Sequence, residues 1–185
     1  MKQQFKNKIM ATTKWAIDPT HSEIGFKVKH MMFTNVSGNF TQFDAAVETE
    51  SDGFDNAKFS FKGVTDSITT GNKDRDAHLL SPDFFDAATF PEITFASTGF
   101  SKINEGEFEL TGDLTLHGIT KPVQLSTEFG GLAKDPWGNT KAGLSITGKI
   151  NRKDWGLNWN SALETGGVLV GEEIKLNFEL QFIKQ

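Results

Sequence analysis

The sequence predicts an all-β fold, an eight-stranded antiparallel barrel with one short helix near residues 72–80. Apolar residues recur at every second position over most of the chain, as they do in strands with one buried face. Seventeen phenylalanines and no tyrosine indicate a dry interior, because a buried Tyr hydroxyl would need a partner. Eight such strands can close on themselves, and closure removes the exposed edges of an open sheet.

A short apolar piece at residues 15–18 comes first, and eight longer strand candidates follow it. These begin near residues 23, 36, 57, 92, 107, 121, 141 and 168. The alternation is clearest at 107–118 and in the C-terminal segment, whose apolar positions are Val168, Val170, Ile174, Leu176, Phe178, Leu180 and Phe182. Helical periodicity would scatter these residues around an axis, so we predict strands.

The second long strand candidate contains a change of parity. Val36 and Phe40 occupy even positions, whereas Phe43, Ala45 and Val47 occupy odd ones. One residue near 41–42 must therefore be absorbed, and a β-bulge is the usual device.

The predicted helix is bounded by ordinary start and stop signals. Asn72 can cap its first turn, and Ser81-Pro82 can end it. Leu79 and Leu80 can then face the sheet.

Length and composition indicate one domain over residues 15–185, preceded by a flexible tail at 1–14. A chain of 185 residues buries enough surface to fold without disulfides, and it contains no Cys. The net charge of −5 argues against a nucleic-acid partner, which would favour a basic face. No apolar run reaches transmembrane length, so we expect no stable membrane insertion.

The polar, basic start of the sequence has no apolar stretch typical of a signal-peptide core. The sequence as written therefore predicts a cytoplasmic protein. If a leader is missing from it, we expect a periplasmic one.

Polar residues give few candidates for chemistry. The four His residues lie in separate segments without the close spacing of a metal site, so we expect no metal. The Gly-x-Ser-x-Gly motif and the phosphate-binding glycine loops are absent from the sequence, so we expect no catalytic residues and no cofactor. The charged cluster around Arg75 and His78 is most simply a set of ion pairs and caps at a barrel rim. In a functional reading, these two side chains meet the polar head of a ligand.

Six segments in order resemble the YceI-like family of polyisoprenoid-binding, lipocalin-like proteins. They are Trp15–Ser22 with Phe26, Val28 and His30; Val36–Phe40; Arg75–Leu79; Asp83–Asp86 with Phe90–Phe95; Gly112–Val123; and Ile150–Gly156. The resemblance covers about residues 15–183. It implies an elongated eight-stranded barrel with an apolar tunnel for an isoprenoid, a quinone or a fatty-acid-like chain, and a binding, storage or transport role rather than an enzymatic one.

Inward-facing side chains are the candidates to line such a tunnel. They are Phe26, Val28, Phe40, Phe43, Phe59, Phe61, Phe84, Phe85, Phe95, Leu114, Leu116, Leu144, Ile146 and Phe178. The candidates for a polar head or rim are His30, Arg75, His78 and Arg152.

Two other readings stay open. An enzyme acting on a lipid-like or reactive small molecule would use His30, His78 or Arg152, and two titratable groups would have to lie within hydrogen-bond reach of one cavity. A structural barrel would instead fill its interior with interdigitated Phe rings and leave no void. A homodimer is compatible with each of these readings.

Overall fold

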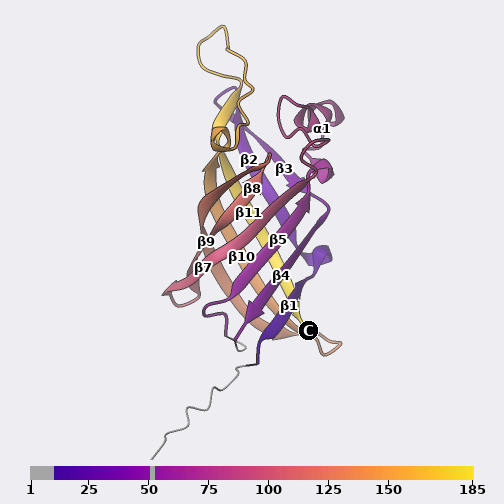
Figure 1. Ribbon diagram of the computed structural model, residues 1–185, viewed down its shortest axis with the longest axis vertical. Coiled ribbons are helices and arrows are strands. Elements are labelled where there is room, and N and C mark those ends of the chain that lie inside the picture. The colour runs from indigo at the N-terminus through magenta and orange to yellow at the C-terminus, as the bar shows by residue number, and fades with distance from the viewer. Residues whose placement is uncertain (1–10, 51–52) are drawn as a thin grey trace, which may run out of the picture.

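The computed structural model describes residues 11–50 and 53–185, and it shows a closed antiparallel barrel with a helix beside one end (Figure 1). The strands are β1 Thr13–Ile17, β2 Glu23–His30, β3 Thr34–Phe40, β4 Phe43–Thr49, β5 Lys58–Val64, β6 Ile68–Thr69, β7 Glu92–Asn104, β8 Glu107–Leu116, β9 Ile119–Lys134, β10 Thr140–Asn151 and β11 Val170–Lys184. The helices are the α-helix α1 Lys73–Leu80 and the 3₁₀ turns η1 Pro19–His21, η2 Thr65–Ser67 and η3 Arg152–Trp155.

These elements form eight barrel strands, as predicted, because three of the strands are interrupted. β1 and β2 both pair with β11, while β4 pairs with β1 and β3 pairs with β2. β5 and β6 pair in turn with β4 and β3. The pairing of β1 with β11 closes the sheet, so the barrel leaves no long free edge.

The predicted irregularity near residues 41–42 is confirmed. β3 ends at Phe40 and β4 begins at Phe43. The intervening Thr41 and Gln42 donate their backbone N–H groups to the carbonyl and the hydroxyl of Ser67, at 3.1 Å each. The apolar side chains change from even to odd positions across this break and stay on the inner face.

The break between β1 and β2 is a single 3₁₀ turn, η1. Its N-cap Asp18 accepts a hydrogen bond from the Thr20 backbone N–H at 3.2 Å. β1 begins at Thr13, two residues before the expected start of the domain. Residues 1–10, most of the expected tail, lie outside the described residues.

The predicted helix is confirmed as α1. The Asn72 side chain accepts a hydrogen bond from the Arg75 backbone N–H at 2.9 Å, which satisfies one free donor of the first turn. The helix ends at Leu80, and the Ser81 N–H bonds to the His78 carbonyl at 3.1 Å.

The two ends of the barrel differ. The helix end carries α1, the β2–β3 turn and the connection from η3 to β11 (Figure 1). Toward the far end, which carries the β7–β8 and β9–β10 turns, aromatic rings fill the interior. Phe100 stacks on Phe108 with centroids 4.5 Å apart, and Trp15 packs on Phe54 at 5.2 Å. This part of the barrel is a packed core.

Candidate ligand-binding cavity

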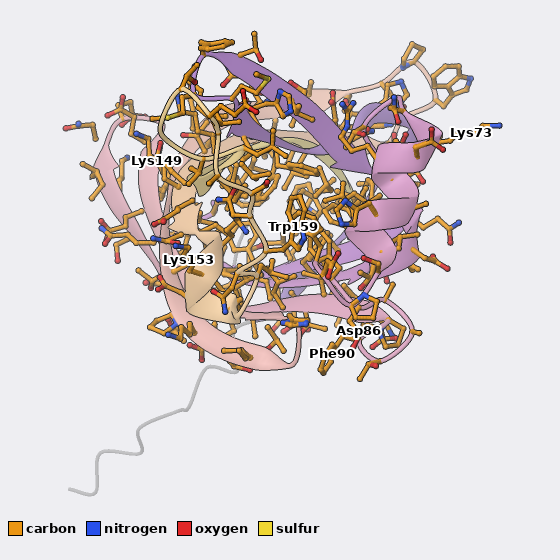
Figure 2. All side chains as sticks on the ribbon, turned by 90° about the horizontal axis from the view of Figure 1, so that it is seen from above. Lys73, Asp86, Phe90, Lys149, Lys153 and Trp159 are labelled. Carbon is orange, nitrogen blue, oxygen red and sulfur yellow. The ribbon has the colours of Figure 1, made fainter. Side chains whose placement is uncertain are left out.

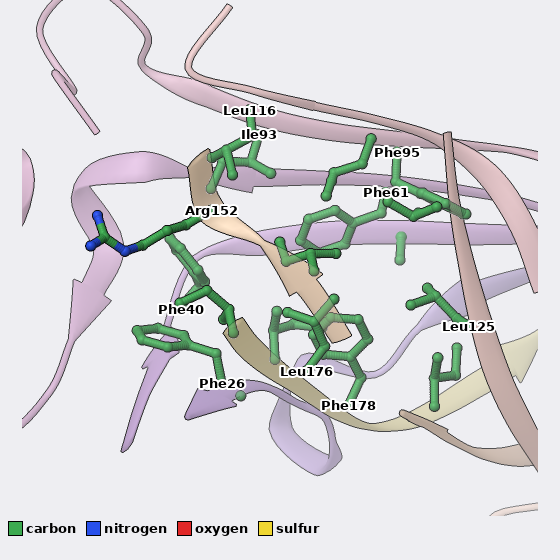
Figure 3. A pocket seen from close by; sticks show the side chains of 18 of the residues that line it. Phe26, Phe40, Phe61, Ile93, Phe95, Leu116, Leu125, Arg152, Leu176 and Phe178 are labelled. Carbon is green, nitrogen blue, oxygen red and sulfur yellow. The ribbon is translucent and has the colours of Figure 1, made fainter. Parts of the chain in front are cut away.

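An apolar cavity of about 190 Å³ extends into the barrel (Figure 3). Its walls come from β2, β3, β4, β5, β7, β8, β9, β10 and β11, together with Leu79, Phe84 and Phe85 from the helix region. Figure 3 shows the rings of Phe26, Phe40, Phe61 and Phe178 around the same space. Apolar cavities of about 150 Å³ stay dry and admit a benzene-sized molecule, so this cavity suits an apolar guest.

Glycines in the wall make room for two of these rings. A Cβ added to Gly112 would lie 2.3 Å from Cζ of Phe95, and one added to Gly38 would lie 2.5 Å from Cζ of Phe26. The outer edge of each ring therefore lies against a backbone position that has no side chain. The cavity depends on these Phe–Gly pairs, because a larger residue at either glycine would push the ring aside.

The helix end of the cavity is covered by aromatic side chains. His78 of α1 makes edge contacts with Phe84 and Trp159, with centroids 5.1 and 4.7 Å apart. Phe84 contacts Trp159 at 5.3 Å, and Phe85 meets Phe40 at 6.1 Å. Viewed from above, Trp159 lies near the middle of the barrel (Figure 2). We refer to His78, Phe84 and Trp159 as the aromatic cap.

Arg152 is the only ionisable side chain among the described residues that line the cavity. It is 3% exposed, and Figure 3 shows its nitrogen end pointing away from the Phe rings. Nε donates to the Gly171 carbonyl at 2.8 Å, Nη1 to the Leu157 carbonyl at 2.5 Å and Nη2 to the Val170 carbonyl at 3.3 Å. Arg152 thus joins the two ends of the connection that carries Trp159.

Burial lowers the pKa of the Arg152 guanidinium from its ordinary value, and the carboxylate of Glu172 acts in the opposite direction. Arginine still keeps its proton in proteins. The mouth of the cavity therefore holds a fixed positive charge that donates to backbone oxygens.

The structure places all but two of the fourteen predicted tunnel residues on the cavity wall. These are Phe26, Val28, Phe40, Phe59, Phe61, Phe84, Phe85, Phe95, Leu114, Leu116, Ile146 and Phe178. Phe43 lies outside the wall and stacks on Phe61 with centroids 6.4 Å apart. Leu144 is 2% exposed within the packed core. These two side chains therefore do not border the cavity, and contact between a ligand and the other twelve stays a prediction.

The four predicted polar residues do not meet at one point. Arg152 lines the cavity, and His78 belongs to the aromatic cap, where its Nε2 lies 2.8 Å from Oδ2 of Asp83. Arg75 is exposed and donates to the Thr70 hydroxyl and carbonyl at 2.7 and 2.9 Å. His30 ends β2 opposite Thr34 and Val170, beyond the lining residues.

Several wall residues were not predicted as such. They are Ile24, Leu79, Ile93, Leu110, Val123, Leu125, Ile150, Leu157, Val170, Ile174, Leu176, Leu180 and Phe182, with Ala45, Gly25 and Ser60. Most belong to the same alternating rows as the predicted residues, so the signal was present in the sequence. Leu157 follows η3 outside any alternating pattern and gave no such signal.

The described part of the chain contains no group of three His, Asp or Glu side chains placed to hold a metal ion. Within the same residues, no helix combines the length and the apolar character needed to cross a membrane.

A closed antiparallel barrel around an apolar cavity defines a lipocalin-like protein. The chain belongs to the YceI-like family, because the sequence model of the YceI-like domain matches residues 15–182. UPF0312 proteins of Staphylococcus aureus strains MSSA476 and MW2 are each 40% identical to it over 171 residues, which span 92% of this chain and 97% of each relative.

Solved structures share the fold. A Campylobacter jejuni YCEI protein is 32% identical with a TM-score of 0.72, over 100% of this chain and 99% of that one. Burkholderia cenocepacia BcnA has a TM-score of 0.75 at 21% identity, over 89% of this chain and 98% of its own. A polyisoprenoid-binding domain from Saccharophagus degradans has a TM-score of 0.69 at 14% identity, over 92% and 98% of the two chains.

Proposed function

We propose that this protein binds the apolar chain of an isoprenoid or similar lipid inside the barrel, and stores or carries it without chemical change. The observation that carries the proposal is a cavity of about 190 Å³ whose wall is apolar apart from Arg152, Ser60 and Gly25. The structural similarity to a polyisoprenoid-binding domain supports the same reading. Quinones and fatty acids present comparable chains and belong to the same ligand class.

Hydrophobic transfer supplies the binding free energy. Each CH₂ that enters the cavity contributes about 0.8 kcal/mol before ordering and association costs, so affinity grows with the length of chain that the cavity admits. No specific contact is needed for affinity. Chain length is then selected by how far the ligand penetrates before it reaches the packed core around Phe100 and Phe108.

The aromatic cap is the proposed entrance. Trp159 lies on the connection from η3 to β11, whereas Phe84 follows α1, so the two sides of the cap come from separate segments. Separation of these segments would open the cavity without breaking a strand pair. The chain would enter with its apolar end first and leave its polar end near Arg152.

A non-catalytic role agrees with the distribution of ionisable groups. Acid–base chemistry needs two titratable groups within hydrogen-bond reach of one substrate. Within the described lining residues there is one such group, Arg152, and its guanidinium bonds to three backbone carbonyls.

The test is a binding titration with geranylgeraniol, a twenty-carbon isoprenoid alcohol, on protein stripped of bound lipid by organic extraction and refolding. Leu114 and Ile146 line the cavity from β8 and β10, and Trp at either position would occupy the space of the ligand. We expect Leu114→Trp and Ile146→Trp each to weaken binding by about tenfold or more, since several methylenes lose their place.

Leu132→Trp is the matched control. Leu132 is 42% exposed on β9, so Trp there adds the same bulk outside the cavity and should leave binding unchanged. Thermal unfolding confirms that each variant is folded. Undiminished binding by folded Leu114→Trp and Ile146→Trp would place the ligand elsewhere and refute the proposal.

A further inference from the structure

Large apolar side chains project into solvent at the helix end of the barrel. In the β2–β3 turn, Met31 is 38% exposed, Met32 60% and Phe33 73%. Val168 of the neighbouring connection is 38% exposed. We call these four residues the apolar tip. They lie at the end where the cavity opens beneath the aromatic cap.

The residue types in the β2–β3 turn are unusual for the backbone conformation that they adopt. Met31 and Met32 have φ values of 51° and 70°, in the left-handed region that Gly and Asn adopt most readily. A hairpin turn of this kind normally carries Asn or Gly. Methionine at both positions strains the backbone, because its side chain disfavours positive φ, and it also exposes apolar surface. Such strain points to a role other than making the turn.

The tip is also held in place. The Met31 N–H donates to the Leu169 carbonyl at 2.8 Å. Met32 lies against Gly167, where an added Cβ would be 2.1 Å from the Met32 sulfur. The β2–β3 turn and the connection before β11 therefore present their apolar side chains together.

Lysines stand behind the tip on the outer face of the barrel. Lys149, Lys175 and Lys27 lie side by side across β10, β11 and β2, and Lys29 lies two residues before Met31. Lys27, Lys29 and Lys175 make no ion pair with any described residue. Of the lysines around this face, Lys149 pairs with Glu173 at 3.3 Å and Lys153 with Glu172 at 2.5 Å.

This arrangement gives a local positive surface on a chain whose net charge is −5. Five lysines (27, 29, 149, 153 and 175) face three carboxylates (154, 172 and 173), and the connection at 157–169 adds the acid Glu164. The α1 side of the mouth carries four acids, Asp74, Asp76, Asp83 and Asp86, against the two cations Lys73 and Arg75. The β2 side is therefore the side suited to an anionic partner.

We propose that the apolar tip docks this protein on the surface of an anionic lipid bilayer, with the mouth of the cavity turned toward the membrane. Apolar side chains that enter the interface beside cations that attract anionic headgroups are the ordinary elements of peripheral membrane binding. With a strand rise of about 3.3 Å per residue, Lys29 stands about 7 Å behind Met31. That lies within the screening length of about 10 Å.

Docking would bring the aromatic cap close to the bilayer, where an apolar chain can pass between lipid and cavity without crossing water. This consequence rests on the proposed function. The docking itself does not, because it depends only on the surface of the barrel.

The test is co-sedimentation with vesicles of phosphatidylcholine alone and of phosphatidylcholine mixed with phosphatidylglycerol. We expect the protein to bind the mixed vesicles and to be released by high salt. In the double variant Met32→Asn with Phe33→Ser, binding should fall about tenfold, since most of the exposed apolar surface of the turn is gone. Asn suits the left-handed backbone, so this variant should fold.

The matched control is Trp137→Ser. Trp137 is 84% exposed in the β9–β10 turn at the far end, and its replacement should leave vesicle binding unchanged. The double variant Lys27→Gln with Lys29→Gln should bind the mixed vesicles more weakly, whereas Lys134→Gln at the far end should bind as the wild type does.

Failure of the wild-type protein to sediment with mixed vesicles would overturn the proposal, as would full binding by the tip variant. In either case, the tip would be a contact for another protein or for none. The cavity variant Leu114→Trp should still bind vesicles. The vesicle experiment therefore tests the docking proposal and the titration tests the ligand-binding proposal, and either proposal can be refuted without the other.

Discussion

At the mouth of the cavity, Arg152 combines deep burial with a positive charge that has no carboxylate within ion-pair distance among the described residues. Backbone carbonyls take the place of a counter-ion. A guanidinium suits this role, because its planar donors can reach several acceptors at once. Arg152 is therefore a structural anchor for the segment that carries Trp159, whatever contact it makes with a ligand.

Replacing Arg152 with Met tests this anchor. The change keeps an apolar stem but leaves the carbonyls of Leu157 and Gly171 without their side-chain donor. An unpaired buried polar group costs about 1–3 kcal/mol, so we expect a loss of about 3 kcal/mol in the free energy of unfolding, measured by urea denaturation. Arg75→Met should cost less than about 1 kcal/mol, because Arg75 makes its bonds at the surface. Equal losses in the two variants would contradict the anchor role.

Single positions could be predicted from the sequence only in part. Alternation indicates which face of a strand a residue occupies, and this was enough to find Phe26, Phe61 and Phe95 on the cavity wall. It does not indicate which inward side chains border the cavity. Phe43 and Leu144 face inward but pack against neighbouring side chains, so period two alone could not separate them from the wall residues.

Among the elements, the joint between β1 and β2 depends on one buried carboxylate. Asp18 accepts hydrogen bonds from Lys141 Nζ of β10 at 2.8 Å and from the Thr20 hydroxyl at 2.6 Å. It also accepts from Gln181 of β11 at 3.2 Å. The hydrogen bond from Lys141, followed by the one from Thr20, holds the pKa of Asp18 well below its ordinary value, although burial acts in the opposite direction. The carboxylate therefore ties the interrupted strand to two neighbours.

The shifted pKa makes stability depend on pH. A carboxyl group with a lowered folded-state pKa stabilises the fold above its unfolded pKa of about 3.9, and this stabilisation is lost as the pH falls toward the folded value. We expect Asp18 to contribute a slope of up to about 1.4 kcal/mol per pH unit below about pH 4. Urea denaturation at several pH values measures this slope.

Asp18→Asn should be less stable than the wild type at neutral pH and should lose less stability on acidification. Asp44→Asn, at an exposed position on β4, is the matched control and should leave the slope as it is. Parallel pH curves for the wild type and Asp18→Asn would show that Asp18 does not carry this dependence.

The elements were predictable where the local signal was strong. Period-two runs predicted the eight barrel strands, the parity change predicted the break at Thr41 and Gln42, and Asn72 with Ser81-Pro82 bounded α1. The path from η3 to β11 was not predictable, because its residues follow no period. Its position over the cavity depends on Arg152 and on ring contacts far apart in sequence.

At the scale of the whole molecule, the sequence was compatible with a filled barrel and with a hollow one, and each description fits one part of the interior. Rings interdigitate toward the far end, whereas the space beneath the aromatic cap remains open. Inward Phe residues are compatible with both states, so their number could not distinguish them. The difference arises from positions such as Gly38 and Gly112, which let rings lie against the wall.

The cavity is therefore closed at one end by the packed core and covered at the other by the aromatic cap. The packed core would stop a ligand chain that enters, and the aromatic cap would cover the bound chain. The apolar tip and the lysines behind it lie at the same end as the cap. The proposed entrance of the ligand and the proposed membrane contact therefore lie at the same end of the molecule.

Native mass spectrometry of the freshly purified protein, followed by organic extraction of whatever it releases, tests the central claim most directly. We predict an adduct at one molecule per chain, identified on extraction as an isoprenoid, a quinone or a fatty-acid derivative, and its loss in Leu114→Trp. A protein that carries no adduct and takes up no added geranylgeraniol would contradict the account.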